Sequence, residues 1–480
     1  MAEASTTPVA ATNLTDSQKN CCLSNKLRLE TNDATGFLYQ RCAAGPVVMS
    51  NIFLGSSLIA LAEMEIGCYD PDDTGLECGK IYGFKPSSLI TIIAVITGIL
   101  SAFLLPFIGA IVDFTPSRHS LGVVSSTVLV VIQAVQIYTV ESTWFPMAVL
   151  QAINGFMYQV ITLAAYGYLP EIALAIEEKK FHWYSSLYYI VMFGHQVIFL
   201  VLIAAVTIIW KTGPVHTGQV SQAIDVVVTG GYFVLTWYYF TKKEAKSELP
   251  KGASLFGAGF TQVFRTAKGL HKHYPKTVGR FFIGCIFSEA AINSFSTVSV
   301  TYINEVLKFD STQISILFLI ILLSTLPGSY FAYWLADKTN PMTAFKAQIV
   351  SFIIVNFAAF LTLTDPSREI AAYVCGVFWG FHLGWYYPLE KLIYAVIIPQ
   401  GQESELAGFF LYCTQILTFL PPLVFTVMNE AGVSLHWAGI HLNIYLFVGL
   451  VFFQLMLPWD DCIEAAKVNA MKQVEPIVQP

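Results

Sequence analysis

The chain has 480 residues, of which 55% are hydrophobic and only 12% are charged, and its mean hydropathy is +0.60. A soluble protein of this length needs more charge on its surface, whereas lipid-facing helices need almost none. The net charge of −6 gives no reason to expect a nucleic-acid partner. The composition is typical of an integral, multi-pass membrane protein.

Twelve apolar stretches follow one another, and each can cross a ~30 Å hydrocarbon core at ~1.5 Å per residue. We therefore expect an all-α integral membrane protein with twelve transmembrane helices in two pseudo-symmetric six-helix bundles. The predicted spans are 42–64, 86–111, 120–139, 144–168, 183–208, 223–240, 277–302, 312–335, 342–363, 370–396, 405–428 and 438–458. The predicted divisions are an N-terminal tail (1–41), a first bundle (42–240), a central loop (241–276), a second bundle (277–458) and a C-terminal tail (459–480).

Lysine and arginine predict the orientation of these spans. With both termini in the cytosol, the cytosolic side holds all of the 26 basic residues except Lys80, Lys85, Lys211, Lys308 and Arg368, as the positive-inside rule expects. The central loop carries apolar residues at helical spacing with basic residues between them. This pattern predicts an amphipathic helix on the cytosolic leaflet, and an ordinary solvated linker is the alternative.

Two of the nine cysteines share the first loop on the far side of the membrane. Cys68 and Cys78 could form a disulfide if this loop faces an oxidising lumen. The other cysteines show no metal-ligand spacing, and buried apolar filler is their simplest interpretation. We therefore expect no metal site.

Acidic turns at matching positions form a repeat. Asp113 follows the second span with Arg118 close behind it, and Asp337 follows the eighth span next to Lys338. Such turns can lock neighbouring helices by charge-assisted hydrogen bonds in one conformation and release them in another. A carboxylate that merely marks a helix end is the alternative, but the repetition favours gating roles for all four residues.

Polar side chains at membrane depth are the candidate solute-binding residues, because they are costly there. The fourth span carries Asn154 and Tyr158 on one face, and the tenth carries His382, Trp385 and Tyr386. The spacing between Asn154 and His382 nearly equals that between the acidic turns, which favours one shared central cavity. Such residues also tie helices together by hydrogen bonds, and that alternative stays open.

Glu289 is the one carboxylate that we place near the membrane midplane, and Asn293 follows it one helical turn later. Burial favours the protonated form of a carboxyl, so we predict that Glu289 couples transport to protons and that Asn293 lies in the solute site. A structural hydrogen bond is the alternative. Lys391, near the end of the tenth span, could bind a solute carboxylate, pair with another helix or extend to the headgroups.

Enzyme signatures are missing. The sequence has no nucleotide-binding G-x-x-x-x-G-K-[ST] run, no G-x-S-x-G and no H-E-x-x-H. We expect no catalytic residue and no cofactor. The expected partners are a small-molecule solute, membrane lipid and protons, and the expected state is a monomer.

Twelve helices in two halves, Asp-centred turns and a long central loop resemble the major facilitator superfamily. Gly109, Asp113 and Arg118 fit its loop pattern loosely, whereas Tyr333 replaces the expected glycine in the second half. A narrower resemblance is to the autophagy-related vacuolar amino-acid effluxers. It rests on Gly380-Phe-His-Leu-Gly384, Lys391, Ile398-Pro399-Gln-Gly-Gln-Glu403-Ser-Glu405 and Tyr168-Leu-Pro170-Glu171.

This resemblance implies a secondary transporter that works by alternating access. It would export neutral amino acids from an acidic vacuole or lysosome into the cytosol, with the plasma membrane as the alternative location. A facilitator for a sugar or an organic anion is a second interpretation, since Trp385 and Tyr386 suit a sugar face as well as an aliphatic side chain. A non-transporting receptor or scaffold on the same fold is the third.

Overall fold

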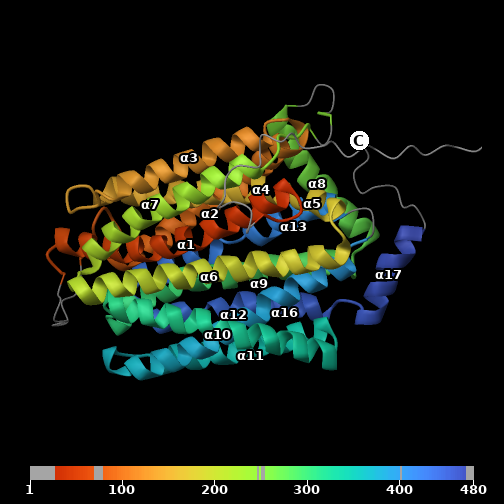
Figure 1. Cartoon of the computed structure of the whole chain (residues 1–480). Helices are drawn as coiled ribbons and strands as arrows, with labels where there is room; N and C mark the ends of the chain where they lie inside the picture. The colour runs from red at the N-terminus through yellow and green to blue at the C-terminus, as the bar shows by residue number, and fades with distance from the viewer. Residues whose placement is uncertain (1–27, 70–78, 246–247, 250–253, 400–402, 472–480) are drawn as a thin grey trace, which may run out of the picture.

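The computed structural model describes residues 28–69, 79–245, 248–249, 254–399 and 403–471. The regular structure of these residues is helical, apart from one isolated bridge between Ile81 and Phe84. The long helices run roughly side by side and form an elongated bundle (Figure 1). Since a helix satisfies its own backbone hydrogen bonds, this architecture suits a lipid environment.

The first half of the chain contributes six long helices, and a short helix, α5, follows α4. Their bounds are α1 (Asn32–Glu65), α2 (Leu89–Phe114), α3 (Arg118–Gln136), α4 (Trp144–Tyr166), α5 (Leu169–Ala175), α6 (Glu178–Trp210) and α7 (Pro214–Tyr239). A 3₁₀ turn at Pro86–Ser88 leads into α2. Helix α1 begins ten residues before the predicted span at 42, and the Thr31 hydroxyl caps it by accepting a hydrogen bond from Ala34 N (3.1 Å).

The second half repeats this plan, with two of its spans broken into shorter helices. The bounds are α9 (Val278–Tyr302), α10 (Ser311–Lys338), α11 (Pro341–Thr362), α12 (Glu369–Ile397), α13 (Glu403–Gln415) with α14 (Leu420–Glu430), and α15 (Leu435–Ile440) with α16 (Leu442–Gln454). A π-helical turn, Ile303–Leu307, extends α9, and a 3₁₀ turn, Pro366–Arg368, precedes α12. The break before α14 lies next to Pro421 and Pro422, which lack the backbone N–H that would continue the ladder.

Eleven helical stretches of the described residues are long and apolar enough to cross a membrane. Helix α12 is not among them, because its Trp, Tyr, His and Gly residues lower its hydropathy. It nevertheless lies lengthwise within the bundle, so the prediction of twelve spanning helices agrees with the structure (Figure 1).

The closest helix pairs lie within the halves, α1 against α7 and α10 against α12. Glycines let the backbones of α10 and α12 approach each other. A Cβ added to Gly380 would lie 2.0 Å from Ile321 O, and one added to Gly384 would lie 2.0 Å from Thr325 O. The halves meet where α6 packs on α10 and where α2 packs on α9, α13 and α14.

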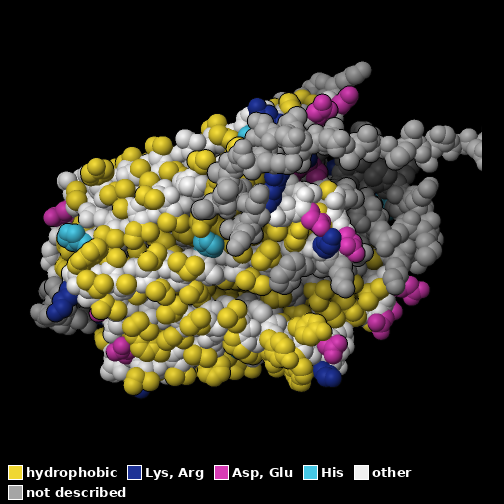
Figure 2. Space-filling model, in the orientation of Figure 1, with side chains coloured by type: hydrophobic (Ala, Val, Ile, Leu, Met, Phe, Trp, Pro, Cys, Tyr) yellow, Lys and Arg dark blue, Asp and Glu magenta, His cyan; other side chains and the backbone are white. Residues whose placement is uncertain are grey.

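Two further helices, α8 (Leu255–His273) and α17 (Trp459–Met471), lie at the same end of the bundle (Figure 1). We call it the α8 end, and we call the opposite end the far end. Helix α8 packs on α2 and also contacts α9 and α13. Hydrophobic side chains cover the long face between the two ends, and acidic and basic side chains gather toward the ends (Figure 2).

Candidate solute site between the two halves

A cavity of about 310 Å³ lies between the halves. Five amide side chains line it: Asn51 of α1, Gln151 and Gln159 of α4, Asn293 of α9 and Gln415 of α13. Hydroxyls of Thr97, Ser101, Ser294, Ser296, Thr297 and Thr418 add to its polar wall. Amides and hydroxyls both donate and accept hydrogen bonds, so the wall suits a polar solute. Of the predicted binding residues, Asn293 lines this cavity.

A cluster of charges, which we call the central ion cluster, lies next to Asn293. It consists of Glu289, Glu390 and Lys391. Glu289 is 3% exposed and accepts a hydrogen bond from Asn293 Nδ2 (2.9 Å). Lys391 Nζ pairs with Glu390 Oε2 (2.7 Å) and lies 4.5 Å from the centre of the Phe410 ring. Glu289 is within electrostatic reach of both Glu390 and Lys391. The structure thus places Glu289, Asn293 and Lys391 together, as a shared site requires.

Arg41 of α1 is a second buried charge near this region, and the sequence analysis placed it in the N-terminal tail. Its side chain is 6% exposed and lies over the rings of Tyr189 and Tyr166, 5.5 Å and 6.0 Å from their centres. Tyr158, a predicted binding residue, is within electrostatic reach of Arg41. The capped start of α1 at Thr31 is the sequence signal that could have found Arg41, because it adds three helical turns to the first span.

Asn154 and His382 do not line the cavity, and their predicted convergence is corrected. Asn154 is fully buried, and its Nδ2 donates to Gln136 Oε1 of α3 (3.3 Å). His382 bonds to Ser351 Oγ of α11 (2.8 Å) and stacks on Phe352 (ring centres 5.6 Å apart). Each residue joins helices of its own half, so the alternative of helix-to-helix hydrogen bonds describes both.

Trp385 and Tyr386 also point into the second half instead of the cavity. The Trp385 ring packs edge-on against Phe331 of α10 (4.8 Å between centres). The Tyr386 hydroxyl bonds to Ser288 Oγ of α9 (2.8 Å), and its ring lies 5.1 Å from that of Phe345. Both side chains therefore position α12 against its neighbours.

Asp225 is a buried carboxylate that the sequence analysis missed, so Glu289 is not alone at membrane depth. Asp225 lies near the middle of α7 with no exposed surface. Its carboxylate accepts hydrogen bonds from Ser50 of α1 (2.6 Å), Gln133 of α3 (2.5 Å) and Thr229. Three donors from three helices of one half indicate a structural role, and the apolar residues around Asp225 in the sequence gave no sign of them.

We expect Asp225→Ala to lower the stability of the protein by about 3 kcal/mol or more, because three buried donors lose their acceptor at a cost of ~1–3 kcal/mol each. The thermal midpoint of unfolding in detergent measures this loss. Asp225→Asn keeps an acceptor oxygen and is the matched control, so its midpoint should fall much less. Equal midpoints for the two variants would show that the carboxylate does not hold these helices together.

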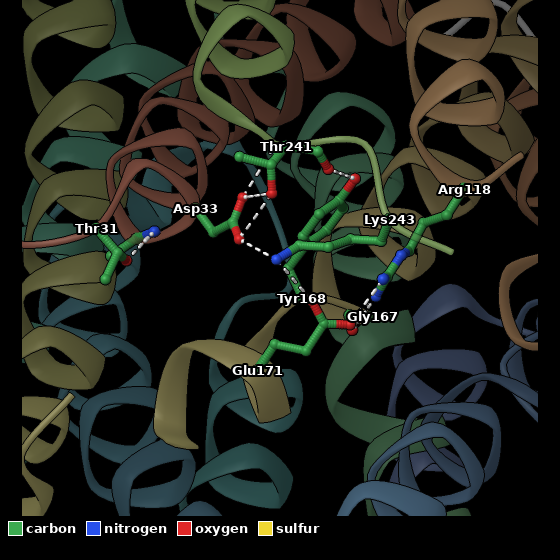
Figure 3. A network of polar contacts seen from close by, with 9 residues as sticks. Thr31, Asp33, Arg118, Gly167, Tyr168, Glu171, Thr241 and Lys243 are labelled. Atoms are coloured by element: carbon green, nitrogen blue, oxygen red, sulfur yellow. Dashed lines mark hydrogen bonds and ion pairs between the residues drawn. The ribbon is translucent and has the colours of Figure 1, made fainter. Parts of the chain in front are cut away.

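A polar network at the α8 end ties the first half together (Figure 3). Arg118 is 1% exposed, and its guanidinium donates to Gly167 O (2.5 Å) and Glu171 Oε1 (2.7 Å). Lys243 bridges Glu171 (3.3 Å) and Asp33 (2.9 Å). Burial opposes the charge of Lys243, but the Asp33 hydrogen bond and the two carboxylates outweigh burial and raise the pKa of its ammonium.

The predicted gating residues therefore have different surroundings. Arg118 pairs with Glu171, while Asp113 accepts a hydrogen bond from Gln262 of α8 (3.5 Å). Asp337 and Lys338 are exposed at the end of α10, and neither forms an ion pair with another described residue. The two acidic turns are thus not equivalent: the first is built into contacts with α8 and the second is not.

At the far end a group of polar contacts, which we call the far-end clasp, joins the start of α2 to the end of α14. Lys85 N donates to Glu430 Oε1 (2.6 Å), and Lys85 Nζ donates to Asn429 O (2.7 Å). Ser88 Oγ donates to Glu430 (2.8 Å), Lys80 pairs with Glu430 (2.6 Å), and Asn429 Nδ2 donates to Ser88 Oγ (2.9 Å). Since α2 and α14 belong to opposite halves, the clasp holds the halves together at this end.

Two sequence features fall partly outside the described residues. Cys68 is disulfide-bonded, but its predicted partner Cys78 is not among them. In the stretch from Ile398 to Glu405, residues 400–402 are not described. The paired glycines before that stretch, Gly380 and Gly384, lie at the contact with α10.

A family model and two known proteins that resemble this chain in sequence all point to the same family. A family model described as "Vacuole effluxer Atg22 like" matches residues 32–467. Autophagy-related protein 22 of Kluyveromyces lactis is 19% identical over 206 residues, which cover 41% of this chain and 41% of that protein. Autophagy-related protein 22 of Cryptococcus neoformans var. neoformans serotype D is 21% identical over 221 residues, covering 42% and 39%. The matched part is thus less than half of each of these relatives.

Solved structures share the fold. A mutant of the nucleoside transporter NupG has a TM-score of 0.59 at 12% identity, covering 89% of this chain and 100% of that one. The partially occluded, inward-open xylose transporter XylE from E. coli has a TM-score of 0.59 at 12% identity, covering 88% and 100%. At such identities the likeness shows the fold alone, and the shared fold agrees with the predicted twelve-helix architecture.

Proposed function

Because the chain belongs to the vacuole effluxer Atg22-like family, we propose that it is a secondary transporter that exports neutral amino acids from the vacuole or lysosome into the cytosol. The observation that carries this proposal is the polar cavity between the two halves, because carriers of this fold bind solute where their repeats meet. The α8 end then faces the cytosol with both termini, as the basic residues favour.

Alternating access follows from contacts at the two ends. The far-end clasp closes the luminal side in this conformation, and it must open before a luminal solute can enter. At the cytosolic side Asp113 contacts α8, which touches both halves. Asp337 and Lys338 have no such contact, so we assign their gating contacts to the opposite conformation.

Glu289 is the proposed proton carrier. It is buried, it contacts Asn293 of the cavity wall, and it lies within reach of the Glu390–Lys391 pair. A proton taken up from an acidic lumen would remove one negative charge from the central ion cluster, and its release to the cytosol would restore that charge. Proton flow down its gradient would thereby drive solute out of the lumen.

The proposal is tested by uptake of radiolabelled leucine into proteoliposomes with and without a pH step. One proton per solute would allow about tenfold accumulation per pH unit, or ~1.4 kcal/mol. We expect Glu289→Gln, which mimics the protonated acid, to keep leucine counterflow and lose accumulation driven by pH. Glu464→Gln, an exposed glutamate of α17, is the control and should behave as wild type. Full pH-driven accumulation by Glu289→Gln would overturn the assignment.

A sugar is the second candidate solute, because five amides on the cavity wall could bind sugar hydroxyls as well as a zwitterion. Counterflow of a labelled pentose or hexose in the same vesicles separates the two. Exchange of sugar without exchange of any amino acid would replace the amino-acid proposal. Exchange of neither would favour a receptor or scaffold.

A further inference from the structure

Arg41 has an unusual environment for a buried charge. Its guanidinium carries five N–H donors, yet among the described residues its one hydrogen-bond acceptor is the sulfur of Met192 (2.6 Å), which is a weak acceptor. It forms no ion pair with any described residue, and it lies over the rings of Tyr166 and Tyr189. A charged side chain at membrane depth is costly without a partner, so an anion from outside the protein would complete this site.

The surroundings of Arg41 place it beside the proposed route of the solute. Tyr166 and Tyr189 are within electrostatic reach of both Arg41 of the first half and Lys391 of the second half. Tyr166 also lines a second cavity of about 120 Å³, whose wall includes Phe409 of the second half. Both tyrosines therefore lie near positive charges of opposite halves, and Tyr166 borders open space.

Lys391, unlike Arg41, already forms an ion pair within the protein. It pairs with Glu390, and the carboxyl of Glu289 lies within hydrogen-bonding reach of Glu390, so two carboxyl groups share one ammonium group. The region thus holds a guanidinium without a carboxylate and one carboxyl group more than its ammonium group can pair with. A zwitterion carries the two complementary groups.

We infer that Arg41 binds the carboxylate of the transported solute, with Tyr166 and Tyr189 flanking it, and that Glu390 receives the solute's ammonium group. A guanidinium matches a carboxylate with two parallel hydrogen bonds. This inference rests on the proposed function and narrows the solute to compounds that carry a carboxylate, α-amino acids above all. It also assigns discrimination between an amino acid and its amide to Arg41.

The test uses the full chain in proteoliposomes, with leucine counterflow inhibited by leucine, leucinamide or 4-methylpentanoate. Leucinamide lacks the carboxylate, and a charge-assisted hydrogen bond contributes ~1.5–3 kcal/mol. The concentration of leucinamide that inhibits the wild type by half should therefore be about tenfold or more higher than that of leucine. In Arg41→Gln the KM for leucine should rise about tenfold or more, and the preference over leucinamide should disappear. Arg41→Lys should recover part of both effects, and the exposed Arg368→Gln should change neither.

The outcomes of this test distinguish the Arg41 assignment from the proposed transport function on which it rests. Leucine transport by Arg41→Gln with wild-type KM and undiminished rejection of leucinamide would overturn the Arg41 assignment and leave the transporter proposal intact. If the wild type moves no amino acid, binding is measured by the shift in the thermal midpoint of unfolding that 4-methylpentanoate causes. Absence of this shift in the wild type would overturn the Arg41 assignment. A shift that persists in Arg41→Gln would overturn it as well. If Arg41→Gln does not fold, Tyr189→Phe gives the same readouts, because loss of the flanking hydroxyl should weaken leucine binding and not leucinamide binding.

Discussion

Replacing Gly384 with valine is expected to prevent assembly of the second half. The valine Cβ would lie 2.0 Å from Thr325 O, closer than any real Cβ contact, and the obstacle is backbone that cannot rotate away. Overpacking typically costs ~1–3 kcal/mol, and we expect the upper end or more here because α10 and α12 form the most extensive contact of this half. Size-exclusion chromatography in detergent and the thermal midpoint of unfolding measure the loss.

Gly194→Val is the matched control for Gly384→Val. Gly194 also lies inside a long helix, α6, but a Cβ added there meets nothing within 4 Å. The same substitution therefore changes helix propensity in both variants and creates a collision in one. Equal elution profiles and equal midpoints would show that α10 can move away from α12 at little cost.

The twelve helices could be predicted because membrane insertion depends on long apolar stretches, which hydropathy reads directly. Helix α12 is the one spanning helix of the described residues that hydropathy alone does not identify. Its Gly380 and Gly384 lower its hydropathy but serve the contact with α10. The repeat of the acidic turns was also visible, although the structure gives Asp113 a contact with α8 and leaves Asp337 exposed.

Arg41 could not be predicted as a site residue from hydropathy, because the first turns of α1 are polar. Asp33, Gln40 and Arg41 are all buried, yet a hydropathy window assigns them to a tail. Their burial depends on neighbours distant in sequence, such as Thr241 at the end of α7, whose N donates to Asp33 (2.8 Å). Only the helix-capping signal at Thr31 was local.

Asn154 and His382 show why matching positions did not locate the cavity. Their separation in the sequence nearly equals that between the acidic turns, and it correctly placed them on corresponding helices, α4 and α12. Which side of a membrane helix faces the cavity depends on packing, and both sides of such a helix are largely apolar. Gln151, one turn before Asn154, lines the cavity and also accepts a hydrogen bond from Gln136. Asn154 donates to the same Gln136 and does not line the cavity.

Glu430→Ala is expected to open the far end of the transporter. This change removes the acceptor for Lys85 N, Ser88 and Lys80 in the far-end clasp. Loss of two hydrogen bonds and one ion pair, partly exposed to water, should shift the balance of conformations by ~2–3 kcal/mol. That free energy corresponds to about a 30- to 150-fold change in the ratio of far-side-open to far-side-closed molecules.

The shift can be followed with a cysteine placed at Thr297, which lines the cavity, and an impermeant maleimide added from the far side. The reaction rate should rise by the same factor as the open population, because labelling requires access to the cavity. Glu141→Ala removes an exposed glutamate from the α3–α4 turn at the same end and should leave the rate unchanged. If Glu430→Ala reacts no faster than Glu141→Ala, the clasp is not the barrier that closes this side.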